Sequence, residues 1–137
     1  MTPKQVALVQ GSWEKLQPAA EAVAQLFYAR LFGIDPSLQA LFKGDMNEQS
    51  RKLASMMTFA VNGLTRLESI LPGLEALGRR HAGYGVKGEH YETVGTALLW
   101  TLGKGLAPGF TGEVRDAWAA AYGVLSTAMR VAAKETA

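Results

Sequence analysis

One stretch of the sequence decides how the rest is interpreted: Leu71-Pro72-Gly73-Leu74-Glu75-Ala76-Leu77-Gly78-Arg79-Arg80-His81. Pro72 can open a helix, because its missing N–H would have no partner in a first turn. Leu74, Leu77 and His81 follow at spacings of three and four, so they share one helical face. Two glycines within four residues of the histidine are expected to end the helix. The stretch therefore predicts a short helix whose apolar side ends in one imidazole.

Spacing alone leaves three interpretations of His81 open. It can be a cation favoured by the negative end of a helix, a core histidine bonded to a backbone carbonyl, or the ligand of a haem iron. A zinc site shared with His90 is disfavoured, because the sequence has no cysteine and offers no further soft ligand. His90 stands where the next helix begins, and we expect it to cap that helix or to lie at the surface.

The composition is that of a folded domain with little net charge. Hydrophobic residues make up 48% of the 137 residues and charged residues 19%, which excludes an intrinsically disordered chain. A formal charge of +2 gives no reason to expect nucleic acid or an anionic membrane as a partner. Without cysteine, disulfides, iron–sulfur clusters and thioether-linked haem are excluded.

No targeting or membrane-spanning segment is visible. The first residues lack the form of a signal peptide, and no apolar run approaches the roughly 20 residues that a bilayer requires. We therefore expect a single cytoplasmic domain covering residues 1–137, with no membrane insertion.

Helical periodicity runs through the whole chain, and no segment alternates with period two. Prolines and glycines divide it into six or seven predicted helices of unequal length, which indicates an all-α domain. The expected features are a helix capped by Thr2, a break at Pro18, a second helix to a break at Asp35-Pro36, a helix over about 47–65, the Pro72 helix, a helix marked by Tyr91 and Leu102, a loop over 103–109, and a last helix capped by Thr111.

The segment Gly83-Tyr84-Gly85-Val86-Lys87-Gly88 matches the glycine pattern of dinucleotide-binding proteins. That motif requires a preceding strand, a helix that opens inside it and an acidic residue about 20 positions later. Here it follows a charged helix end in a chain with no predicted strand. We interpret these glycines as a turn between two helices.

Two polar residues interrupt otherwise apolar helical stripes. Tyr28 lies among Phe27, Leu31 and Phe32, and Gln49 begins the stripe that continues through Leu53. Considered alone, Tyr28 can be a buried phenol bonded to a backbone carbonyl, and Gln49 can be a solvated residue in a first turn. No serine stands in the setting of a catalytic nucleophile.

Taken together, these segments resemble a globin. The resemblance covers essentially the whole chain in the right order and is greatest for bacterial single-domain globins, the group that includes Vitreoscilla-type haemoglobins and the globin domain of flavohaemoglobins. The segments that carry it are Gly11-Ser12-Trp13, residues 26–32, residues 36–42, residues 49–53, residues 77–81 with 84–86, residues 90–95, and Ala117-Trp118 with residues 121–124.

The resemblance implies a three-on-three helical sandwich around haem b and gives each site residue a role. His81 takes the place of the proximal histidine that binds iron. Tyr28 and Gln49 take the two distal polar positions that face the bound ligand. Phe42 packs on the macrocycle, and Leu53 lies over the iron.

The resemblance also implies further contacts with the haem. Lys52 and Arg80 are candidates for contacts with the haem propionates. The proximal lining is assigned to four residues: Leu77, Val86, Tyr91 and Val94.

The function implied by the resemblance is reversible binding of dioxygen for storage, delivery or scavenging. The alternative is a nitric oxide dioxygenase that converts NO and O2 to nitrate with a separate reductase. A phenol and an amide can both donate hydrogen bonds to the partial negative charge that dioxygen acquires on haem, whereas carbon monoxide gains less. The expected partners are O2, NO and CO, and the expected state is a monomer or weak homodimer.

One departure from the flavohaemoglobin pattern concerns the last helix. In those globins a late glutamate, together with the tyrosine matched by Tyr91, makes the proximal histidine more anionic. Counting from Tyr122, that position falls on Ala133, and Glu135 is two residues away. We therefore expect a weaker electron push to the iron. Because the sequence ends at Ala137, no flavin or nicotinamide domain is expected to follow.

Overall fold

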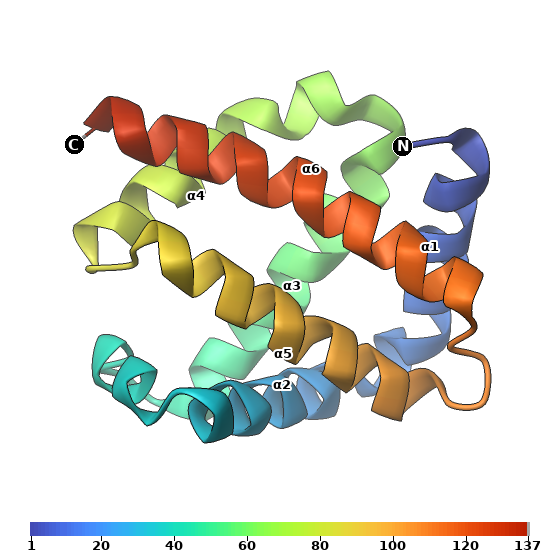
Figure 1. The fold of residues 1–137 in the computed structure, drawn as a ribbon, viewed down its shortest axis with the longest axis horizontal. Coiled ribbons are helices and arrows are strands. Elements are labelled where there is room, and N and C mark those ends of the chain that lie inside the picture. Colours follow the sequence, from blue (N-terminus) through green and yellow to red (C-terminus); the bar gives the residue numbers. More distant parts are fainter. Residues whose placement is uncertain (137) are drawn as a thin grey trace.

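The computed structural model describes residues 1–136, with side chains through residue 134, and contains no strand within that range (Figure 1). The all-α prediction is therefore confirmed. In chain order the elements are α1 (Pro3–Leu16), the 3-10 turn η1 (Gln17–Ala19), α2 (Ala20–Ile34), η2 (Pro36–Leu41), α3 (Met46–Asn62), η3 (Gly63–Arg66), α4 (Leu67–Gly83), α5 (Gly88–Leu106) and α6 (Gly112–Thr136).

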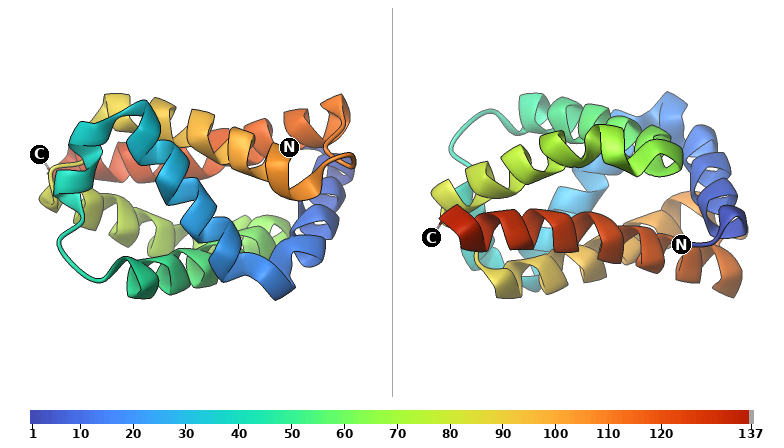
Figure 2. Two further views of the ribbon diagram at one scale, coloured as in Figure 1. Left: turned by 90° about the horizontal axis from the view of Figure 1, so that it is seen from below. Right: turned by 90° about the horizontal axis from the view of Figure 1, so that it is seen from above.

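The helices surround a common interior. Figure 2 shows α5 and α6 along one side of the molecule and α3 and α4 along the other, while α2 crosses between them. The most extensive packing joins α4 to α6, and α2 packs on both α3 and α5. Helix α4, which carries His81, is therefore held mainly by the last helix of the chain.

Within residues 1–136, no helix combines the length and apolar character needed to cross a bilayer.

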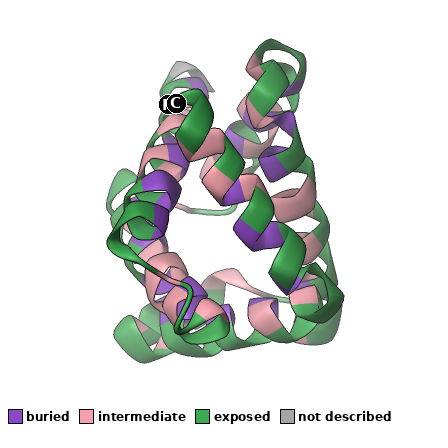
Figure 3. Ribbon diagram, turned by 90° about the vertical axis from the view of Figure 1, so that its right-hand side faces the viewer, coloured by how far each residue is buried: buried purple, intermediate pink, exposed green. Residues whose placement is uncertain are grey.

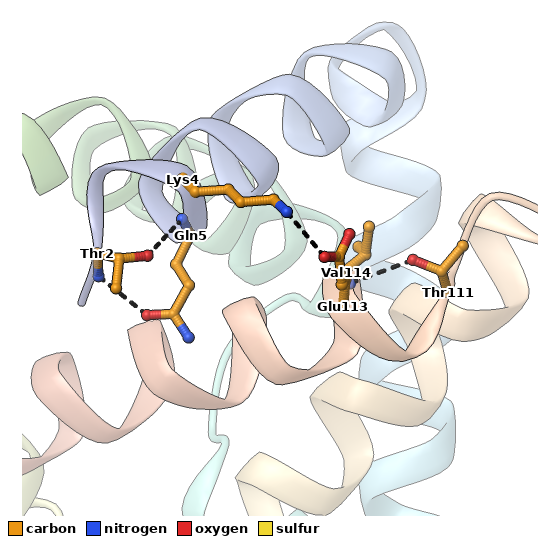
Figure 4. Close-up of polar contacts among 6 residues, drawn as sticks. All are labelled: Thr2, Lys4, Gln5, Thr111, Glu113 and Val114. Carbon is orange, nitrogen blue, oxygen red and sulfur yellow. Dashed lines mark hydrogen bonds and ion pairs between the residues drawn. The ribbon is translucent and has the colours of Figure 1, made fainter.

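Side chains cap the helix starts where the sequence predicted them. Thr2 and Gln5 form a reciprocal capping box at the start of α1, and the Val114 N–H donates to Thr111 Oγ1 at the start of α6 (Figure 4). Lys4 Nζ lies 2.9 Å from Glu113 Oε1 and connects these two helix starts. Since both groups are exposed, that ion pair adds little to stability.

Two expected boundaries are wrong. Pro72 does not open a helix, because α4 begins at Leu67 and continues through Pro72. The proline costs only one hydrogen bond, to the first turn, and the packing of α4 outweighs that loss. The loop expected from Gly103 is also wrong at its start, since α5 extends to Leu106. Gly103 and Gly105 leave room for close neighbours, Phe110 and Leu16, rather than forming a turn.

Figure 3 colours the ribbon by burial, and the buried stretches lie mainly where the helices face one another. One core cluster joins α1, α5 and α6 around Trp13, Leu102 and Trp118. The other joins α2, η2 and α5 around Phe27, Tyr28 and Leu38. The two clusters are linked, since Leu98 packs against both.

We expect Gly78→Ala to destabilise the protein by about 1–3 kcal/mol through overpacking. Gly78 is buried, and a Cβ atom there would overlap the backbone carbonyl of Met129 on α6. Urea unfolding measures the change. Gly123→Ala is the matched control, since Gly123 is an α6 glycine with nothing within 4 Å of the added atom. The control should gain about 0.5–1 kcal/mol from helix propensity, and an equal gain at position 78 would contradict the close packing.

Candidate functional site

An apolar cavity of about 200 Å³ lies between the helices. This volume exceeds that of the roughly 150 Å³ apolar cavity that stays dry and binds benzene in an engineered protein. Close-packed protein interiors contain few voids larger than a water molecule, so a cavity of this size is unusual. The chain therefore leaves interior space that its own side chains do not fill. The lining comes from all six helices and includes His81, Leu53, Leu77, Val86, His90, Tyr91, Val94, Tyr122, Leu125 and Met129.

The ring of His81 is fixed by its own helix. Its Nδ1 lies 2.8 Å from the carbonyl oxygen of Leu77, one turn earlier. A carbonyl can only accept, so a neutral ring carries its proton on Nδ1 and keeps the lone pair on Nε2. Among the described residues, Nε2 has no hydrogen-bond partner. This is the tautomer that a metal-binding imidazole requires.

The charge state of His81 follows from its surroundings. Burial lowers the pKa of the imidazole, the Leu77 carbonyl opposes that change, and the nearby Arg80 lowers the pKa further. The ring is therefore neutral at pH 7. This result argues against a helix-end cation, while the carbonyl bond agrees with both remaining interpretations.

The haem-free protein is expected to lose stability as the pH falls from about 7.5 to about 5. Because the pKa of His81 is lower in the folded state than its ordinary value of 6.5, the unfolded chain binds more protons below that value. Urea unfolding at the two pH values measures the loss. His81→Gln removes the titrating group, so its stability should depend less on pH. Equal slopes for the two proteins would contradict this linkage.

The four residues assigned to the proximal side, Leu77, Val86, Tyr91 and Val94, all lie in the cavity wall, as does Leu53. Tyr91 is the polar exception among them. Its hydroxyl is buried and is the one buried side-chain polar atom without a hydrogen-bond partner in the described part of the chain. Leaving a buried phenol without a partner costs free energy, so Tyr91 is the unusual residue in this part of the wall.

Tyr28 and Gln49 contact each other, although they are 21 positions apart. The Gln49 amide Nε2 donates to the Tyr28 hydroxyl at 3.1 Å, and Tyr28 is buried. Among the described residues, no backbone carbonyl accepts a hydrogen bond from the Tyr28 hydroxyl, and Gln49 is half-buried rather than solvated. Burial raises the pKa of the Tyr28 phenol, and the Gln49 bond partly opposes that change. The phenol is therefore protonated at neutral pH.

Phe42 belongs to the same group of side chains. Its ring centroid lies 5.2 Å from that of Tyr28, in an edge-to-face arrangement. Neither Tyr28, Gln49 nor Phe42 lies in the cavity wall itself. They are connected to it through Leu53 and Val94, which pack against this cluster and also line the cavity.

The two predicted propionate contacts, Lys52 and Arg80, lie outside the cavity wall. Both are exposed, and Lys52 Nζ forms an ion pair with Glu48 Oε1 at 3.6 Å. Their role toward a haem stays a prediction.

Several lining residues were not assigned to the site from the sequence. His90 caps α5 as expected, with its Nδ1 accepting the Lys87 N–H at 2.9 Å, but it also lines the cavity. Tyr122, Leu125 and Met129 close the cavity from α6. Their helical spacing indicated a buried stripe, and only the packing of α6 identifies what that stripe faces.

The side chains around the cavity do not form a site for a bare metal ion. Among the described residues, no group of three His, Cys, Asp or Glu side chains is arranged to hold one. A single available imidazole nitrogen beside an apolar space fits a metal that brings its remaining ligands with it, as haem does.

Comparisons with known proteins agree with this geometry. The sequence model of the globin family matches residues 25–129. A flavohemoprotein of Bordetella parapertussis is 33% identical over 129 residues, which cover 92% of this chain and 32% of that protein. A flavohemoprotein of Bacillus thuringiensis is 31% identical over 131 residues, with 93% and 32% covered. The chain therefore spans about a third of the length of these curated relatives.

A solved structure shows the same fold. A bacterial globin from Campylobacter jejuni superposes with a TM-score of 0.87 at 27% identity, covering 98% of this chain and 97% of the other. The resemblance noted in the sequence is thus confirmed, and so is the predicted globin fold.

Proposed function

Because the chain belongs to the globin family, we propose that it holds haem b through His81 and binds dioxygen reversibly. When bound, haem supplies the iron that ligates the gas. The observation that carries the proposal is a neutral imidazole whose Nδ1 is bonded to Leu77, leaving Nε2 available beside an apolar cavity. Leu53, Leu77, Val86 and Val94 would exclude water from the haem.

Tyr28 and Gln49 would provide the polar contacts to the gas. Since the Gln49 amide already donates to the Tyr28 oxygen, the phenol proton remains free to donate elsewhere. The phenol is protonated at neutral pH, and the phenylalanine rings around it exclude competing water. Such a donor favours a ligand that acquires negative charge. This supports tight, slowly released dioxygen with a smaller effect on carbon monoxide.

Nitric oxide dioxygenation is the second candidate. It is favoured by the flavohemoprotein relatives, which match this chain over about a third of their own length. Formation of nitrate from NO and O2 takes up one electron, so sustained turnover would need electrons from a reductase. Lys52 and Arg80 would help hold the propionates in either function.

Absorption spectra of the purified protein test the proposal. Ferric, ferrous and oxygenated samples should each give a haem spectrum, and removing oxygen should restore the ferrous form. A protein that takes up no haem, or oxidises at once on exposure to oxygen, would contradict reversible binding. Sustained NO consumption with a reductase, well above the autoxidation rate, would favour the dioxygenase. A single stoichiometric reaction is expected from either candidate.

A further inference from the structure

Arg130 of α6 lies over the ring of Tyr91 on α5. The centre of its guanidinium is 5.7 Å from the ring centroid, within the range of a cation–π interaction. The guanidinium also lies close to the start of α5, because a Cβ atom at Gly88 would be 3.6 Å from Arg130 Nη2. A side chain at position 88 would therefore compete for this space.

Tyr91 is fixed from the side of α6 as well. The Tyr122 hydroxyl donates to the backbone carbonyl of Tyr91 at 2.5 Å. The Tyr122 ring packs directly against the backbone at Gly95, because a Cβ atom added there would lie 2.8 Å from the ring. The ring of Tyr91 thus has a cation on its face and belongs to the wall of the cavity that His81 also lines.

This part of α6 offers no negative charge in the described residues. Between positions 122 and 134 the helix carries the cations Arg130 and Lys134 and no aspartate or glutamate. Ala133, one turn after Arg130, occupies the place where the flavohaemoglobin pattern has its glutamate, and the side chain of Glu135 lies outside the described residues. Within the described residues, the buried Tyr91 hydroxyl accordingly has no carboxylate to bond to.

We propose that Arg130 is a positioning residue that acts through the face of Tyr91 and makes the His81 side of the cavity electropositive. The inference rests on the proposed function, since its consequence concerns a bound haem. A cation beside a low-dielectric cavity disfavours additional positive charge inside it. Arg130 therefore favours the ferrous over the ferric state, opposite to the effect of a carboxylate.

Arg130→Met tests the proposal in the haem-loaded protein, because methionine keeps much of the apolar stem and removes the charge. The redox equilibrium should shift toward the ferric state by about threefold to tenfold. A tenfold change corresponds to 59 mV for one electron. Arg66→Met, which removes an arginine of η3 that is exposed as Arg130 is, is the control for loss of one positive charge. Equal shifts in the two variants would overturn the proposal.

Ala133→Glu tests the same proposal by adding a negative charge instead of removing a positive one. Adding a carboxylate one turn from Arg130 should lower the reduction potential in the same sense as Arg130→Met. It should also change the iron–histidine stretching frequency in resonance Raman spectra. A higher potential in Ala133→Glu would contradict the electrostatic account.

A haem-independent measurement separates this inference from the proposed function. In the purified chain with 13C-labelled tyrosines, Arg130→Met should move the ring resonance of Tyr91, assigned with Tyr91→Phe, more than that of exposed Tyr84. An unmoved Tyr91 resonance would overturn the contact with Arg130. Failure to take up haem with a shifted Tyr91 resonance would instead contradict the proposed function alone.

Discussion

Replacing His81 by alanine is expected to leave a protein that loses haem or binds it only weakly. The Nε2 of His81 is the metal-binding nitrogen available in the cavity wall, because His90 accepts the Lys87 N–H at Nδ1 and in its neutral form carries its proton on Nε2. The rest of the wall supplies apolar contacts, which hold a macrocycle without fixing its iron. Haem retention is measured by absorbance after gel filtration against a haem-binding competitor.

His90→Ala is the matched control for His81→Ala. Both variants remove an imidazole from the cavity wall, but only His81 leaves a ring nitrogen with a free lone pair, because Nδ1 of His90 accepts the Lys87 N–H and a neutral ring then carries its proton on Nε2. We expect His90→Ala to retain haem while losing some stability at the start of α5. Circular dichroism verifies that both variants remain helical. Normal haem retention and a normal five-coordinate ferrous spectrum in His81→Ala would contradict the assignment of the iron ligand.

Tyr28→Phe is expected to raise the dissociation rate of dioxygen by at least about tenfold. The substitution removes one hydroxyl and keeps the ring that packs against Phe27 and Phe42. A hydrogen bond to a charged acceptor in a dry site contributes about 1.5–3 kcal/mol, which converts to roughly ten- to a hundred-fold. Stopped-flow displacement of oxygen by carbon monoxide gives the rate directly.

Two comparisons give the Tyr28→Phe result its meaning. Carbon monoxide dissociation should change much less, because that ligand develops little charge. Tyr84→Phe removes a hydroxyl from a side chain that is 66% exposed and should leave both rates unchanged. An unchanged oxygen rate in Tyr28→Phe would mean that the phenol does not contact the ligand.

Local chemistry made most of the fold predictable. Thr2 and Thr111 cap helices where a side-chain oxygen precedes an apolar helical stripe, and Asp35 caps the 3-10 turn that begins at Pro36. The two wrong boundaries share one cause. Pro72 and Gly103 are poor helix residues, yet each lies in a helix whose tertiary packing outweighs its intrinsic preference. Propensity acts locally, whereas that packing involves distant segments.

The position of His81 could be predicted from the sequence, whereas the contacts between side chains of different helices could not. The spacing of Leu74, Leu77 and His81 placed the imidazole on an apolar helical face, and the structure puts His81 in the cavity wall. The bond between Tyr28 and Gln49, and the position of Arg130 over Tyr91, depend on how separate helices cross. Periodicity within one helix carries no information on such crossings.

The backbone contact between Gly78 and Met129 has a mechanical consequence. At Gly78 the backbones of α4 and α6 are in direct contact, so no side chain between them could rearrange to absorb a displacement of His81, three residues later. A pull on that imidazole would be passed to the C-terminal helix as a rigid-body shift. If a metal binds His81, strain at that residue would thus reach α6.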